Sequence, residues 1–135
     1  MEQPAPIPSG ERQRQAYTTM RATEALVLGK KASGTPTLDS YLEANAVFAE
    51  EAAKTTKNPR TGEVHIDNAE RYRRIRIGSA EGKRRFCHEQ AERAQRDADK
   101  FDKSAKETAD EHKLLMAQKH RALAVGWLLF EATIT

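Results

Sequence analysis

A stretch of basic residues offers the clearest chemistry in this sequence. The chain reads Arg-Tyr-Arg-Arg-Ile-Arg-Ile at residues 71–77, and Lys-Arg-Arg follows at residues 83–85. Guanidinium groups grip phosphates, and the interleaved Tyr72 could stack on a base. The same charges could instead bind anionic headgroups or an acidic subunit, or form a solvated helix face that pairs with glutamates three or four residues away. This basic patch consists of Arg71, Arg73, Arg74, Arg76, Lys83, Arg84 and Arg85.

The histidines and the single cysteine do not form a catalytic or metal-binding set. Metal ligands on a helix need a spacing of three or four residues, whereas His112 and His120 are two turns apart. Cys87 is next to His88, but adjacent residues of a helix point about 100° apart, so the two side chains cannot readily pair. We therefore expect no catalytic residue, no metal site, no cofactor and no enzymatic activity.

Residues 122–135 form a mainly apolar stretch in which Glu131 is the only charged residue. They are too few to span a bilayer as a helix, which needs ~20 residues. Basic residues precede them, and tryptophan favours membrane interfaces. An isolated soluble monomer would expose this stretch, so we expect it to meet either another protein or a membrane. The predicted membrane or partner contacts are Leu123, Trp127, Leu128 and Phe130.

A ladder of small and apolar residues, spaced alternately by four and three, runs from Cys87 to Leu129. Such spacing keeps one stripe on one side of a helix and is typical of coiled coils and helical hairpins. The alanines within it allow a second helix to approach closely. We call this ladder the seam, and it predicts a helix interface formed by Cys87, Ala91, Ala94, Ala98, Phe101, Ala105, Leu115, Ala122 and Leu129.

Together these patterns predict an all-α protein, either an antiparallel helical hairpin or a small bundle, built around one very long C-terminal helix. No proline interrupts the chain after Pro59, which favours a long helix. We expect an extended proline-rich arm at residues 1–10, two shorter helices at 11–57, a turn at 58–67 and the long Ala-rich helix at 68–135.

Local signals refine these boundaries. Thr35 and Pro36 are suited to cap and start the second helix. Residues 67–70 resemble a capping box that would start the long helix. Gly78 and Gly82 are its weak points, where one helix could end and the next begin.

Composition limits the core and the partners. The 135 residues form one domain at most, and 38% apolar against 32% charged residues indicate a thin core. The net charge of +3, from 23 basic and 20 acidic residues, favours interleaved charges on exposed helix faces over a dedicated polyanion binder. With one cysteine there is no intrachain disulfide. We see no signal peptide and no complete transmembrane helix, which leaves the compartment unassigned.

The second half of the chain resembles an uncharacterised bacterial family of small membrane-anchored proteins with a long, coiled-coil-like helix. The similar stretch is residues 91–135, in particular Gln-Lys-His-Arg-Ala-Leu-Ala-Val at 118–125. The resemblance implies a helical stalk near a membrane and adds no catalytic residues.

We therefore expect a noncatalytic structural or accessory subunit of a larger assembly, which acts through a long helical interface and could be associated with a membrane. Its partners would be other protein subunits, in a homo- or hetero-oligomer, with a membrane surface as a further candidate. One alternative is a nucleic-acid or polyanion binder that uses the basic patch. Another is a peripheral membrane protein anchored by its apolar C-terminus. We expect no small-molecule substrate.

Overall fold

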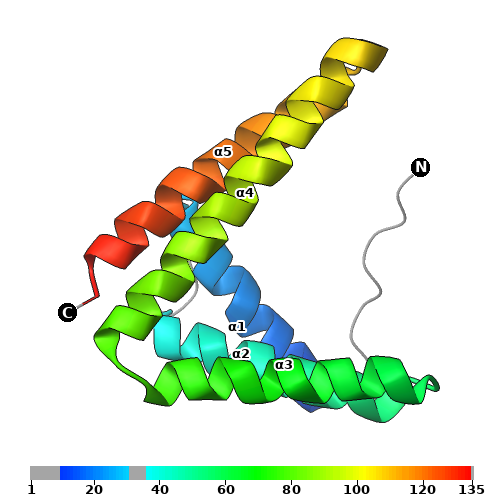
Figure 1. The fold of residues 1–135 in the computed structure, drawn as a ribbon, viewed down its shortest axis with the longest axis vertical. Coiled ribbons are helices and arrows are strands. Elements are labelled where there is room, and N and C mark those ends of the chain that lie inside the picture. The colour runs from blue at the N-terminus through cyan, green and yellow to red at the C-terminus, as the bar shows by residue number, and fades with distance from the viewer. Residues whose placement is uncertain (1–9, 31–35, 135) are drawn as a thin grey trace. The chain divides into compact units, whose positions relative to one another are not determined.

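The computed structural model describes residues 10–30 and 36–134, which form five helices and no strand (Figure 1). The prediction of an all-α fold is thus confirmed. Of the expected N-terminal arm, only Gly10 lies within the described residues. The helices are α1 (Glu11–Val27), α2 (Leu38–Thr55), α3 (Pro59–Ile77), α4 (Ala80–Thr108) and α5 (Glu111–Ala132).

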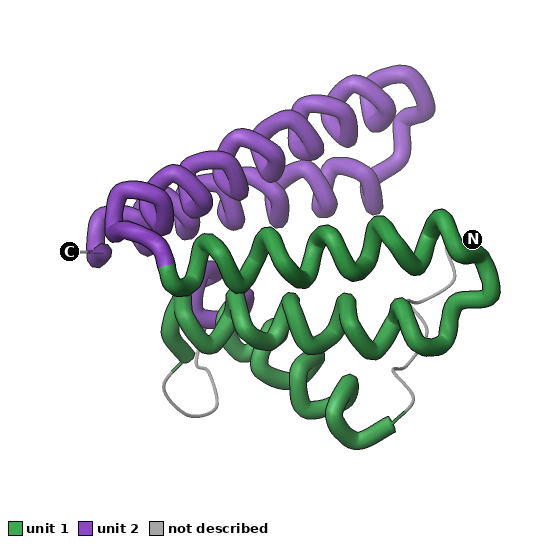
Figure 2. Tube along the Cα trace, turned by 60° about the horizontal axis from the view of Figure 1, so that its bottom comes forward, with its two compact units in different colours: residues 1–23, 32–77 green, residues 24–31, 78–135 purple. Residues whose placement is uncertain are grey.

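The chain divides into two compact units, coloured green and purple in Figure 2. Unit 1 contains most of α1 together with α2 and α3. Unit 2 contains α4 and α5 and also the last turn of α1, which begins at Glu24. The helix α1 therefore contributes to both units.

A capping box starts α2. The Thr37 backbone N–H donates to the Ser40 hydroxyl at 3.0 Å, and the Ser40 N–H donates to the Thr37 hydroxyl at 3.1 Å. These bonds satisfy amide groups that the first turn of a helix leaves without partners. The helix consequently starts at Leu38, slightly later than the sequence predicts. Pro36 precedes it, and Thr35 lies outside the described residues.

The helix α3 starts at Pro59, inside the segment 58–67 for which the sequence predicts a turn. The Asn58 side chain accepts hydrogen bonds from the backbone N–H of Arg60 at 3.0 Å and of Thr61 at 3.4 Å. Proline suits the first helical position because its missing N–H has no partner there. This early start signal takes precedence over the later one at residues 67–70, so residues 59–67 are helical.

In unit 1, α2 and α3 pack side by side around small side chains. Ala46 and Ala49 of α2 and Ala69 of α3 are buried together, and Tyr72 packs against them. Because alanine is small, two helices packed through it can approach to the lower end of the usual ~8–10 Å axial distance. Unit 1 therefore holds a thin core.

The long helix predicted for residues 68–135 is not continuous: the structure divides it among α3, α4 and α5. The first break is at Gly78. Ser79 has extended backbone angles, and its hydroxyl accepts a hydrogen bond from the Gly82 N–H at 3.1 Å. Ser79 thus caps α4 at one of the two weak points that the sequence indicates.

The second break, between α4 and α5, is not predicted by the sequence. Ala109 adopts the left-handed conformation with φ 52° and ψ 41°. The Asp110 carboxylate then accepts a hydrogen bond from the His112 N–H at 2.9 Å and caps α5. The chain reverses here, and α5 packs back along α4 (Figure 2). Unit 2 is therefore a two-helix hairpin, where a single long helix was expected.

Replacing Ala109 with glycine is expected to stabilise the protein by about 0.5–1 kcal/mol, because glycine adopts the left-handed conformation without the steric cost that alanine bears. Urea unfolding followed by circular dichroism measures the change. The matched control is Ala122→Gly, at an exposed position inside α5, which should lower stability by about 1 kcal/mol. If both variants were destabilised equally, the left-handed turn at Ala109 would be contradicted.

A glycine with positive φ follows the last turn of α1. Gly29 has φ 74°, and its N–H donates to the Leu26 carbonyl at 2.9 Å. The Lys30 N–H donates to the Ala25 carbonyl at 2.8 Å. These bonds satisfy carbonyl groups at the helix end and stop α1 there.

This end of α1 lies against α5 in unit 2. The Val27 carbonyl oxygen is directly opposite Gly126, and a β-carbon at position 126 would also come within 2.7 Å of Val27 Cγ1. Both Val27 and Gly126 are buried. A side chain at position 126 would collide with Val27, so the close contact requires glycine.

Candidate interaction surface and groove

The α4 half of the seam is buried in unit 2. It faces α5, whose Ala117, Ala124 and Trp127 are also buried. Phe101 is half-buried. This half therefore forms a helix interface, and its partner is the following helix of the same chain. Its buried residues are Cys87, Ala91, Ala94, Ala98 and Ala105.

Most of the α5 half of the seam lies away from α4 and is exposed, whereas Gly126, which the same spacing includes, is buried against Val27. Leu115 is 62% exposed and Leu129 is 66% exposed, and Ala122 between them is exposed as well. The reversal at Ala109 explains the change, because it turns a different face of α5 toward α4. We name the exposed side the outer α5 face, and it consists of Leu114, Leu115, Ala122, Val125, Leu128 and Leu129.

The four predicted membrane or partner contacts do not lie on one surface. Trp127 is only 4% exposed and packs edge to face on Phe86, with ring centroids 6.2 Å apart. It also contacts Phe130, which is half-buried. Leu123 is half-buried, and Leu128 is exposed on the outer α5 face. Trp127 is therefore part of the core of unit 2 and does not belong to the outer α5 face.

In the part of the chain that the structure describes, no helix combines the length and the apolar composition that crossing a membrane requires.

Part of the basic patch is engaged by carboxylates of α2. Arg73 donates to Glu50 at 2.6 Å and to Glu43 at 3.1 Å, and Arg76 forms an ion pair with Glu43 at 3.2 Å. The hydrogen bond from Arg73, together with its charge, lowers the pKa of Glu50, and the hydrogen bonds to Glu50 and Glu43 raise the pKa of Arg73. Arg12 of α1 adds an ion pair to Glu50 at 3.9 Å. These arginines therefore join the helices of unit 1.

Stability is expected to depend on pH through the bond between Glu50 and Arg73. The folded pKa of Glu50 lies below its ordinary value of 4.5. The Glu50–Arg73 bond therefore contributes its full share of folding stability above pH 4.5, and this share is lost as the pH falls through the folded pKa. Both side chains are about one-third exposed, which limits the contribution to about 1 kcal/mol or less. In urea unfolding, Arg73→Met should therefore cost more stability near pH 7 than near pH ~3. An equal loss at both pH values would contradict this link.

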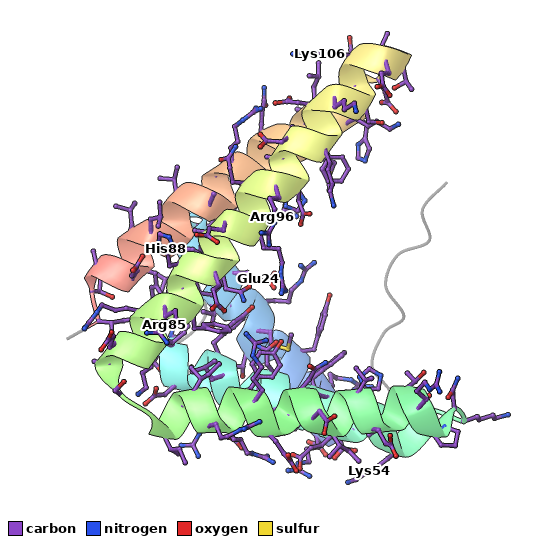
Figure 3. All side chains as sticks on the ribbon, viewed as in Figure 1. Glu24, Lys54, Arg85, His88, Arg96 and Lys106 are labelled. Carbon is purple, nitrogen blue, oxygen red and sulfur yellow. The ribbon has the colours of Figure 1, made fainter. Side chains whose placement is uncertain are left out.

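The other basic residues are divided between the two units. Arg71 and Arg74 are exposed on α3 in unit 1, whereas residues 83–85 belong to α4 in unit 2. Arg84 donates to the Ile134 carbonyl at 3.2 Å. Arg85, labelled in Figure 3, forms an ion pair with Glu81 at 3.6 Å. The sequence did anticipate pairing with nearby glutamates, but it missed the pairing of Arg73 and Arg76 with α2.

Cys87 is fully buried, and its reactivity is correspondingly low. Burial, together with the nearby charge of Glu131, raises the pKa of the thiol to about 12. The thiolate is the reactive form of cysteine, so near pH ~8 only about one molecule in ten thousand would carry it. This environment agrees with the prediction that Cys87 is a core residue.

We expect Cys87 to react with an aromatic disulfide reagent at least about a thousandfold more slowly in the folded protein than in the unfolded chain. The assay needs no second variant, because the chain has a single cysteine. Absorbance of the released thiolate gives the rate, first in buffer and then in concentrated urea. Similar rates in the two solutions would show that Cys87 is accessible.

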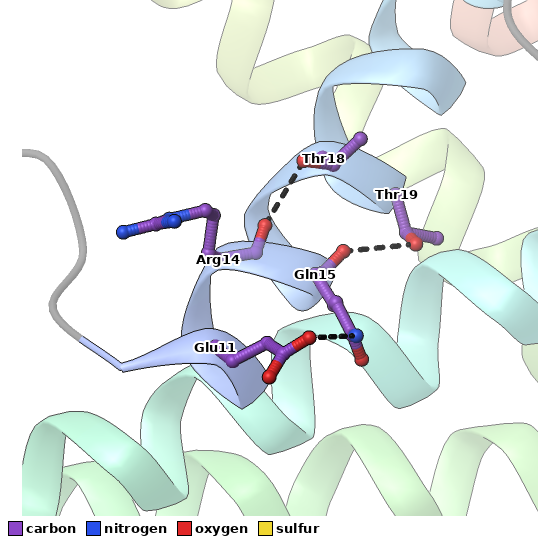
Figure 4. A pocket seen from close by; sticks show the side chains of 5 residues that line it. All are labelled: Glu11, Arg14, Gln15, Thr18 and Thr19. Carbon is purple, nitrogen blue, oxygen red and sulfur yellow. Dashed lines mark hydrogen bonds between the residues drawn. The ribbon is translucent and has the colours of Figure 1, made fainter.

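Among residues 10–30 and 36–134, no three His, Cys, Asp or Glu side chains come together as metal ligands. A shallow space of about 520 Å³ lies beside α1, and its lining residues all come from that one helix (Figure 4). The hydrogen bonds among them are local to α1, from Gln15 to Glu11 and from Thr18 to the Arg14 carbonyl. This surface does not enclose a ligand.

A second space, of about 490 Å³, lies in the groove between α4 and α5. The rings of Phe101 and His120 stack across it, with centroids 5.3 Å apart and an interplanar angle of 14°. The Lys113 ammonium donates to the Ser104 hydroxyl at 2.7 Å. The lining thus combines a flat apolar wall with charged and polar groups from two helices. We name this space the α4/α5 groove, lined by Asp97, Lys100, Phe101, Ser104, Lys113 and His120.

Within residues 10–30 and 36–134, the helices thus carry an exposed apolar face on α5 and a polar groove between α4 and α5. No protein-family model, curated protein or solved structure matches this chain.

Proposed function

We propose that this protein is a noncatalytic structural or accessory subunit of a larger assembly, in which the outer α5 face contacts a helix of a partner subunit. The observation that carries this proposal is the row of large apolar side chains exposed on one side of α5. Val125 is 59% exposed and lies between the more exposed Leu115 and Leu129. Large exposed apolar side chains that gather on one side of a helix are typical of an interaction site, and the exposed Gln118 and Arg121 lie among them here.

The spacing of the outer α5 face favours a helical partner. Leu115, Ala122 and Leu129 are separated by seven residues, the repeat at which two helices can stay in contact along their length. The small Ala122 leaves room for a side chain of the partner, whereas Gly126, the next position on this side, is already covered by Val27. An apolar, leucine-rich helix fits this arrangement.

The outer α5 face by itself is too small to form a stable protein interface. The 22 residues of α5 give a helix about 33 Å long, and a strip about 10 Å wide along it covers roughly 330 Å². A stable interface buries about 800 Å² on each partner. We therefore propose that the partner also contacts other elements of this chain.

Two observations make the alternatives less favourable. The ion pairs of Arg73 and Arg76 with α2 reduce the charge that the basic patch can offer to a nucleic acid or another polyanion. The burial of Trp127 removes the strongest interfacial anchor from the apolar C-terminus. Membrane association of the whole assembly, which the resemblance over residues 91–135 implies, remains part of the proposal.

A photo-crosslinking amino acid at Leu129 tests the partner contact in the organism that produces the protein. We expect a discrete crosslinked product of constant mass from this position. The control is the same amino acid at Lys106, an exposed residue near the end of α4 (Figure 3), which should give little or none. Equal crosslinking from both positions, or none from Leu129, would overturn the proposal.

Flotation with anionic liposomes separates the membrane alternative from the protein contact. The intact chain should remain unbound on its own, and Leu128→Glu should change nothing. Flotation of the wild-type chain that is lost in Leu128→Glu would instead support the peripheral membrane protein.

A further inference from the structure

We propose that the α4/α5 groove is a binding site for a small planar organic anion. This inference is independent of the proposed structural role, because the groove and the outer α5 face involve different residues of α5. Its volume of about 490 Å³ is large enough for a single-ring ligand, and its lining comes from two helices, unlike that of the space beside α1.

The middle of the groove offers a surface for stacking. The ring of Phe101 comes from α4 and the ring of His120 comes from α5, and they lie nearly parallel. Both side chains are half-buried, so part of this aromatic surface faces the open groove. A flat aromatic ligand can extend such a stack, because offset stacking of rings is favourable.

One end of the groove carries positive charge. The Lys113 ammonium is half-buried and is held by a hydrogen bond to Ser104, a neutral hydroxyl. This contact positions the ammonium without cancelling its charge. Lys100, which lies between Asp97 and Ser104 along α4, adds a second ammonium to the lining. A carboxylate or phosphate placed here would receive charge-assisted hydrogen bonds from lysine and could also accept one from the serine hydroxyl.

The other end of the α4/α5 groove carries a hydrogen-bond acceptor, the carboxylate of Asp97. Asp97 precedes Ser104 by seven residues of α4, which places it about 10 Å along the helix axis from the lysine end. Its carboxylate can accept a hydrogen bond from an amino or hydroxyl group. The lining therefore suits a ligand with an anionic group at one end, an aromatic ring in the middle and a hydrogen-bond donor at the other end.

Titration of the full-length, ¹⁵N-labelled protein with 4-aminobenzoate tests this assignment, because the compound carries all three features. Saturable chemical-shift changes should be confined to residues 97–104 and 113–120, with a Kd on the order of 1 mM for so small a ligand. Benzoate, which lacks the donor, and aniline, which lacks the anion, should each bind more weakly.

The variant Lys113→Gln tests the charge that the site requires. It keeps a donor that can reach Ser104 but removes the ammonium, so binding of 4-aminobenzoate should weaken about tenfold. Lys106→Gln removes an equal charge from an exposed position of α4 outside the groove and should leave the Kd unchanged. The proposal is overturned if no saturable shift appears up to the solubility of the probe, or if the two variants weaken binding equally.

Discussion

Replacing Phe86 with alanine is expected to destabilise the protein by about 3–5 kcal/mol, the usual cost of removing a large buried aromatic side chain. Phe86 is 2% exposed and is among the largest fully buried side chains in the described residues. Its ring meets Trp127 at an interplanar angle of 88°, so the substitution also removes an edge-to-face aromatic contact. Urea unfolding measures the loss, and fluorescence of the single tryptophan reports on this part of unit 2.

Two milder substitutions provide a comparison for Phe86→Ala. Phe86→Leu retains most of the apolar volume and should cost about 1–1.5 kcal/mol, so it remains measurable if the alanine variant does not fold. Phe130 also contacts Trp127, at 5.9 Å between centroids, but it is only half-buried. Phe130→Ala should therefore cost less than Phe86→Ala. The packing described for unit 2 would be refuted by the reverse order.

Replacing Gly126 with alanine is expected to destabilise unit 2 by about 1–3 kcal/mol, because the added methyl group overpacks the contact with Val27. Helix propensity acts in the opposite direction, since alanine is favoured over glycine inside a helix by up to ~1 kcal/mol. A net loss of stability therefore reports the collision. Hydrogen exchange at residues 24–30 should become faster, because the last turn of α1 is displaced from α5.

The same substitution at Gly82 provides the control. A β-carbon there would lie 3.6 Å from the Ser79 hydroxyl oxygen, which is an ordinary contact. Gly82→Ala should therefore raise stability by about 0.5–1 kcal/mol through helix propensity. Stabilisation by Gly126→Ala as well would mean that Val27 does not pack against α5.

Short-range signals predicted much of the fold from the sequence. The alternation of small and charged residues indicates helices, and the capping hydroxyl of Ser79 follows a glycine that marks the end of α3. Two such signals competed at the start of α3. Asn58 and Pro59 determined it, rather than the capping box at residues 67–70, because they come earlier and already provide a complete helix start.

The turn at Ala109 could not be predicted in the same way. The seam keeps its spacing through residues 105–115, and alanine is not one of the residues, glycine and asparagine, that usually adopt the left-handed conformation at a helix end. Only Asp110, as an N-cap, is a conventional signal there. Tertiary packing of α5 on α4 therefore overrides the local helix preference.

The candidate surfaces depend on this turn. With α5 folded back, the exposed half of the seam becomes the outer α5 face, and Phe101 reaches His120 across the α4/α5 groove. Neither consequence follows from residue spacing along a single helix. The partnership of Arg73 with Glu43 and Glu50 was missed for a related reason, because the sequence suggested pairs within one helix and not between α2 and α3.

The division of α1 between the two units has a consequence for folding during synthesis. Val27 emerges from the ribosome 99 residues before Gly126, against which it packs. This separation far exceeds that between α2 and α3, so loop-closure entropy delays the contact relative to the pairing of those two helices. The last turn of α1 must remain uncovered until α5 has been made. During that interval it is the segment most open to a chaperone or to a premature partner.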